Sequence, residues 1–186
     1  YASVTYRASG GRLPGQPATE PPARVLIVDE HINSFFQIDE ALGPLAATHE
    51  VGQVVTTYER TGQKALQLLA SEQTGRRPVP LVIVGSMPDM NALDLARAMG
   101  ERRVPVVMLA DRPDESLRSL ARGVGIGAVV TRLSIEPDFK QGRAEFRRVV
   151  ARQLGLAPRT DPLRGAAGSA TAKVAGTRSY SPERIN

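Results

Sequence analysis

Cysteine and tryptophan are both absent from the 186-residue chain. Without cysteine, the chain can have no disulfide framework, thiolate metal site, iron–sulfur cluster or cysteine nucleophile. It has only two histidines, His31 and His49, which are too few for a histidine-rich metal site. Aromatic residues make up 4% of the chain, so a folded core must be built from Val, Leu, Ile and Ala. We therefore expect neither a bound metal nor a cofactor.

Long apolar runs are also missing. No segment approaches the roughly 20 apolar residues that a membrane-spanning helix requires, and no signal peptide is recognisable. We accordingly expect a cytoplasmic protein. The mean composition, with 41% hydrophobic and 23% charged residues, is typical of a chain that folds as one domain with flanking segments.

The formal net charge of +5 is unevenly distributed along the sequence. Residues 23–139 hold 12 basic and 15 acidic residues, whereas residues 140–186 hold 10 basic and 3 acidic residues. A basic tail of this kind binds an acidic protein, a nucleic acid or an anionic membrane, or it simply aids solubility. No aromatic residues alternate with its arginines, as a single-strand binding surface would require.

Both ends of the chain have the composition of extended tails. Residues 1–22 contain four prolines and no periodic apolar pattern, and residues 157–186 are rich in Ala, Gly, Ser and Thr. The folded domain is therefore expected over residues 23–156. A tyrosine in each tail, Tyr6 or Tyr180, could anchor it on a partner, with a plain linker as the alternative.

The middle of the chain alternates between short apolar runs and segments with helical spacing. The runs predict strands buried on both faces, at residues 24–28, 53–57, 81–84, 104–109 and 128–131. Helical spacing follows each run, at residues 32–42, from Gly62 onward, and at 92–99, 111–122 and 138–156. Five such units in succession predict an α/β fold with a doubly wound, five-stranded parallel sheet. Its functional site is expected beyond the carboxyl ends of the strands.

Five sequence segments together resemble a known family. They are VLIVDE, TGQKALQLL, LVIVGSMPDMNALDLARAM, VPVVMLAD and GVGIGAVVTRLS, between about Arg24 and Leu156. In their order and spacing they resemble the receiver domain of bacterial response regulators, the CheY-like domain with a flavodoxin-like fold. The resemblance implies the same doubly wound sheet.

The departures from the family pattern affect the phosphorylation chemistry. The resemblance places the phosphoacceptor aspartate at Val84 or Gly85, the switch hydroxyl at Ala110 and the conserved lysine at Arg132. The acidic pair survives as Asp29 and Glu30. These residues imply a degenerate phosphorylation pocket: Asp29, Glu30, Val84, Gly85, Ala110 and Arg132. We expect Arg132 to occupy the pocket and to pair with Asp29 or Glu30.

Other side chains near this edge offer weaker alternatives. Ser86 has a hydroxyl, but a serine nucleophile needs an activating base and no histidine is placed to supply one. Asp89 and Asp94 could be displaced phosphoacceptors. We interpret Asp89 as a turn residue and Asp94 as a residue on an exposed helix face.

We therefore predict a non-catalytic pseudo-receiver that acts as an interaction module, an adaptor or scaffold subunit of a larger bacterial assembly whose tails dock on protein partners. The fourth helix, fifth strand and fifth helix would offer a face for a homodimer. Candidate partner-binding residues are Arg118, Arg122, Arg143, Arg147, Arg148, Tyr6 and Tyr180. The alternatives are a phosphorylation-independent regulator that binds a small molecule or nucleic acid, and an unusual phosphoacceptor.

Overall fold

The computed structural model describes residues 5–6, 22–73, 80–100 and 104–159. The strands are β1 Thr5–Tyr6, β2 Ala23–Val28, β3 Val54–Glu59, β4 Leu81–Val84, β5 Val106–Ala110 and β6 Ala128–Thr131. The helices are α1 Ile32–Leu42, α2 Leu45–Thr48, α3 Gly62–Gln73, α4 Ala92–Gly100, α5 Glu115–Gly123, the 3-10 helix η1 Arg132–Ile135 and α6 Lys140–Gln153. In the described part of the chain, every helix is too short or too polar to cross a bilayer.

The strands form one sheet with the order β1-β3-β2-β4-β5-β6. Strands β2 to β6 are parallel to one another, which confirms the predicted five-stranded parallel sheet. The sheet has one further strand, β1, which lies in the segment that the sequence predicts to be an extended tail. It pairs antiparallel with the edge strand β3, with Thr5 opposite Thr57. Two residues carry no periodic pattern, so this pairing depends on the partner strand and not on the local sequence.

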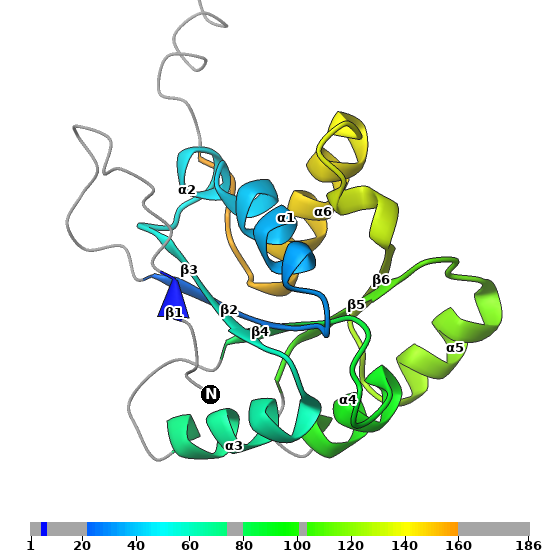
Figure 1. The fold of residues 1–186 in the computed structure, drawn as a ribbon. Coiled ribbons are helices and arrows are strands. Elements are labelled where there is room, and N and C mark those ends of the chain that lie inside the picture. The colour runs from blue at the N-terminus through cyan, green and yellow to red at the C-terminus, as the bar shows by residue number, and fades with distance from the viewer. Residues whose placement is uncertain (1–4, 7–21, 74–79, 101–103, 160–186) are drawn as a thin grey trace, which may run out of the picture.

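Two apolar cores cover the two faces of the sheet. One contains Ile27 and Ile83 from the sheet, with Phe35 of α1 and Phe146 of α6. The other contains alternate residues of the same strands, with side chains from α3 and α4 and with Ala121 of α5. Figure 1 shows α1 and α6 on one side of the sheet and α3, α4 and α5 on the other. Strands buried on both faces are why β2 and β4 have continuous apolar sequences.

The folded part extends beyond the predicted boundary at Leu156. Residues 157–159 run beside the segment after α1: Glu50 N donates to Ala157 O at 2.8 Å, and Arg159 N donates to Thr48 O at 2.9 Å. The Arg159 guanidinium also donates to Ala46 O and Val51 O, each at 3.2 Å. Composition does not indicate which backbone groups form hydrogen bonds, so the sequence places residues 157–159 in the tail.

The chain enters the domain at the same place. Ala23 N donates to Gln53 O at 2.8 Å, two residues from the carbonyl that Arg159 reaches. Residues 46–53, which we call the junction segment, therefore hold both ends of the domain. This segment lies at the amino ends of the strands, away from their carboxyl ends.

Candidate functional site

A cavity of about 680 Å³ lies at the carboxyl edge of the sheet. It is lined by the loop that follows β4, by the end of β5, by Arg132 directly after β6, and by Glu30 after β2. The edge is a topological switch point, because β2 lies between β3 and β4 and the chain winds outward on both sides of it. Open α/β sheets bind their ligands at such points.

Asp29 is the most deeply buried polar residue of this edge, with none of its surface exposed. Its Oδ1 accepts from the backbone N–H of His31 at 2.8 Å, and its Oδ2 accepts from Arg132 Nη1 at 2.9 Å. The Tyr58 hydroxyl donates to its backbone carbonyl at 2.7 Å. Burial, and to a smaller extent the negative charge of Asp29, raise the pKa of the Tyr58 hydroxyl above its ordinary value.

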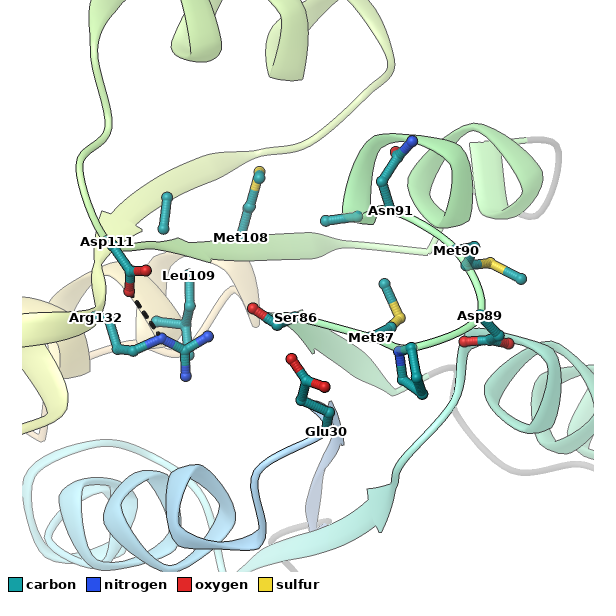
Figure 2. Close-up of a pocket in the computed structure, with 14 residues that line it drawn as sticks. Glu30, Ser86, Met87, Asp89, Met90, Asn91, Met108, Leu109, Asp111 and Arg132 are labelled. Atoms are coloured by element: carbon teal, nitrogen blue, oxygen red, sulfur yellow. Dashed lines mark hydrogen bonds and ion pairs between the residues drawn. The ribbon is translucent and has the colours of Figure 1, made fainter.

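Arg132 is the first residue of η1, directly after the edge strand β6. Besides Asp29, its Nη1 donates to Ser34 Oγ at 2.7 Å and its Nε donates to Asp111 Oδ1 at 3.2 Å. Figure 2 shows the guanidinium turned toward the interior of the site, with Asp111 at its outer side. The expected pairing of Arg132 with Asp29 is thus confirmed, whereas no contact joins it to Glu30 among the described residues.

The sequence left two candidates for the position that faces the pocket, Val84 and Gly85, and the structure distinguishes them by the direction in which each one faces. Val84 lies opposite Val28 in the sheet and its side chain is fully buried in the second core. Gly85 faces the other way: a Cβ atom added there would overlap Asp29 Oδ2 and lie 3.0 Å from Arg132 Nη2. The residue that faces the ion pair is therefore Gly85.

The remaining predicted pocket residues bring no nucleophile to the ion pair. Ala110 lies at the end of β5 and offers only a methyl group, and Glu30 lines the cavity with a half-buried carboxylate. Ser86 is exposed on the loop, and the described lining holds no histidine beside its hydroxyl. In the described residues, no three His, Asp or Glu side chains are grouped so that they could hold a metal ion.

Asp89 has a longer-range role than the turn chemistry assigned to it. Its Oδ1 and Oδ2 accept from the backbone N–H groups of Gly62 and Gln63, each at 2.9 Å, so that it caps α3 from another loop. Partial burial raises the pKa of this carboxyl, but the hydrogen bonds from backbone N–H groups outweigh burial and hold the pKa below its ordinary value. Asp94 lies on an exposed helix face as expected, bonded to Arg97 at 2.8 Å.

The candidate partner-binding arginines differ in exposure and in their contacts within the domain. Arg118, Arg122 and Arg148 are exposed, and Arg122 pairs with Glu115 at 2.7 Å. Arg147 donates to Ala41 O at 3.2 Å, and so lies against α1.

Arg143 offers little exposed surface to a partner. Its side chain is only 11% exposed, because it donates to Ile135 O and to Glu40, each at 3.1 Å. The hydrogen bond and charge of Arg143 lower the pKa of Glu40. Tyr6 lies in β1, and Tyr180 lies outside the described residues.

No protein-family model matches the sequence, and no curated protein matches it. Solved structures of the same architecture are numerous. One is the receiver domain of a sensor histidine kinase from Pseudomonas aeruginosa with magnesium in its active-site cleft, with a TM-score of 0.53 and 19% identity, covering 72% of this chain and 98% of that one. Another is a phosphorylated cyanobacterial phytochrome response regulator, with a TM-score of 0.56 and 17% identity, covering 74% and 99%.

A third is the receiver domain of a LuxO-type repressor from Vibrio parahaemolyticus, with a TM-score of 0.56 and 16% identity, covering 72% and 91%. The shared architecture comprises the parallel strands β2 to β6 and the helices on both faces of the sheet. This chain therefore has the fold of the response-regulator receiver domain.

Proposed function

We propose that this protein is a non-catalytic module of receiver fold, which binds other proteins without being switched by phosphorylation. The observation that carries the proposal is the arrangement of Gly85, Asp29 and Arg132. The residue facing the pocket has no side chain, and the space it leaves is occupied by an ion pair.

Phosphoryl transfer to a receiver requires a carboxylate nucleophile, a divalent metal and a cation that neutralises the developing charge. The relative from Pseudomonas aeruginosa holds magnesium in its cleft, and the cyanobacterial relative is phosphorylated. In this chain Oδ2 of Asp29 is bonded to Arg132, and Gly85 supplies no oxygen. Mg²⁺ requires a near-octahedral shell of oxygen ligands, and Asp29 with Glu30 would make an incomplete shell.

The partner we propose is a protein complex, bound through the two tails. Support comes from the junction segment. It bonds to Ala23, close to the end of the N-terminal tail, and to Arg159, just before the C-terminal tail. Two segments leaving from one place can contact a single partner surface. A basic C-terminal part, with 10 basic and 3 acidic residues over 140–186, suits an acidic partner surface.

A homodimer through α5, β6 and α6 is the further arrangement that we propose. Leu120 of α5 is 57% exposed, and Arg118 and Arg122 flank it on the same helix. Exposed leucine between arginines is compatible with a small self-complementary contact.

The absence of phosphorylation is tested by intact-mass measurement of the full chain after incubation with acetyl phosphate and Mg²⁺. We expect an unchanged mass under conditions in which an active receiver domain gains one phosphoryl group. A single adduct that disappears in the Asp89→Asn variant would overturn the proposal, because it would identify a displaced phosphoacceptor.

Partner binding is tested by affinity capture from the source cells, using residues 1–186 and a shorter chain of residues 22–159. The shorter chain ends after Arg159 so that the contacts with the junction segment stay intact. We expect the full chain to retain a defined protein complex that the shorter chain loses. Retention of nucleic acid that is lost steeply with added salt would favour the nucleic-acid alternative instead, and capture of nothing would contradict the proposal.

A further inference from the structure

The cavity at the carboxyl edge has an apolar wall made largely of methionine. Three of the four methionines of the chain, Met87, Met90 and Met108, line it. Each is partly buried and packs against the second core. Figure 2 shows Met87 and Met108 rising from the loop and from β5 on the side where Asn91 lies. Methionine side chains adapt their shape and make favourable contacts with aromatic rings.

The charged groups of the lining are predominantly acidic. Arg132 is its one basic residue among those described, against Glu30, Asp89 and Asp111. The guanidinium is already bonded to two carboxylates, Asp29 and Asp111, so that its charge is more than balanced. An incoming anion would thus meet a net negative surface, whereas a cation would be attracted.

Glu30 is the carboxylate best placed to meet such a cation. Its side chain is 35% exposed and turns toward Ser86, another residue that lines the cavity (Figure 2). Its charged neighbour is the His31 ring at 3.6 Å, which forms an ion pair only when protonated. Among the described residues, neither lysine nor arginine contacts it.

The wall is held in place before any ligand arrives. Asp89 bonds the loop to the first two residues of α3, and Met90 packs so closely on Gly62 that a Cβ there would overlap its sulfur. A pocket held open in this way binds without the cost of ordering a loop. Its volume of about 680 Å³ is within the range of small-molecule sites.

From these observations we propose that the cavity binds a small organic cation, an amine that carries an aromatic group. The ammonium would lie at Glu30 and the ring against the methionine wall. A metal ion is disfavoured as the cation, because no described group of three suitable side chains surrounds this space. The proposal goes beyond a role in protein binding and does not depend on it.

The test uses the full chain labelled with ¹³C at the methionine methyl groups, titrated with 2-phenylethylamine and followed by NMR. Single Met→Leu substitutions assign the four signals. Met99 is fully buried and does not line the cavity, so its methyl group serves as an internal reference. We expect saturable shifts of Met87 and Met108, with Met99 unmoved. Two probes of similar shape, neutral 2-phenylethanol and anionic 3-phenylpropanoate, should bind several-fold more weakly.

A pair of variants tests the role of the carboxylate. Glu30→Gln should weaken binding of the amine by roughly tenfold, the size expected for one charge-assisted hydrogen bond, while leaving binding of the alcohol unchanged. Glu145→Gln, on an exposed face of α6, should bind as the unaltered chain does. An unchanged Met99 signal shows that each variant is folded.

Three outcomes would overturn the inference: no shift at millimolar amine, equal binding of all three probes, or equal affinity of the Glu30→Gln variant. None of these outcomes affects the phosphorylation and capture experiments, so failure of this inference and failure of the proposed function are distinguishable.

Discussion

The Nη1 atom of Arg132 lies 2.9 Å from Oδ2 of Asp29, although the two residues are 103 positions apart in the sequence. Asp29 directly follows β2, in the interior of the sheet, and Arg132 begins η1 directly after the edge strand β6. The bond therefore links the carboxyl ends of strands that are not neighbours in the sheet. Because the side chain of Asp29 is buried, its charge depends on this guanidinium for compensation.

Replacing Arg132 by Ala should lower the free energy of unfolding by about 3 kcal/mol, because it leaves a buried carboxylate without its counter-charge. Urea denaturation of the full chain measures the change. Arg148→Ala is the matched control, since this exposed arginine should change stability by no more than about 0.5 kcal/mol. If the ion pair is the cause, Asp29→Asn should cost less in the Arg132→Ala background than alone. Equal stability of Arg132→Ala and Arg148→Ala would contradict this account.

Gly85→Ala should destabilise the protein by about 1–3 kcal/mol, the usual cost of adding an atom to a filled interior. The new methyl group would overlap the Asp29 carboxylate, which cannot move without breaking its bonds to Arg132 and to His31 N. Gly100→Ala is the control at the end of α4, where a Cβ meets nothing within 4 Å. Thermal denaturation of both variants decides the point, because two indistinguishable melting temperatures would show that the space beside Gly85 is not filled.

Asp89→Asn should lower the free energy of unfolding by about 1 kcal/mol at pH 7, because the amide has one acceptor oxygen for two backbone N–H groups and lacks the negative charge that favours a helix N-terminus. The folded pKa of Asp89 lies below its ordinary value of 3.8, so the ionised cap stabilises the protein above that pH. That contribution disappears as the pH falls through the folded pKa. The difference in free energy of unfolding between wild type and variant should therefore narrow progressively as the pH is lowered from about 5 to below the folded pKa.

The measurement for Asp89 is a series of urea denaturation curves across this pH range. Asp138→Asn, at an exposed position before α6, serves as the control for the loss of one charge. A gap between wild type and Asp89→Asn that stays constant with pH would show that the carboxylate is not the source of the stabilisation.

A chain that ends after Leu156 should be less stable by about 2 kcal/mol than one that ends after Arg159. The longer chain retains the hydrogen bonds of Ala157 and Arg159 to the junction segment, and each contributes about 0.5–1.5 kcal/mol. Differential scanning calorimetry of the two truncated chains measures the difference. Equal melting temperatures would place the end of the folded domain at Leu156.

Much of this fold was predictable because its strands are short, apolar and fully buried. The run LVIV at 81–84 and the helical pattern at 32–42 coincide with the bounds of β4 and α1. The register of β6 also predicted that Arg132 pairs with Asp29 or Glu30, and the structure shows the pair with Asp29. Continuous apolar runs specify buried strands strongly, since no other arrangement of them removes so much apolar surface from water.

The parts that sequence reasoning missed depend on contacts between distant segments. The capping of α3 by Asp89 joins residues 27 positions apart, and neither helix-start signal nor turn signal describes it. The choice between Val84 and Gly85 required knowing which face of the sheet each one occupies. The sequence around Arg143 does not distinguish it from the other arginines of a basic helix, because its partners, Glu40 and Ile135, belong to other elements.

The junction segment has a consequence for the connectivity of the domain. Because the segment bonds to Ala23 at one carbonyl and to Arg159 at another close by, the two ends of the folded unit are neighbours. Joining Arg159 to Pro22 by a short linker would close the domain into a ring, with every strand pairing from β2 to β6 retained. Such a ring could be reopened at the turn around Gly125, which connects α5 to β6. A circular permutant of this kind should keep the sheet, since chain order is not what holds its strands together.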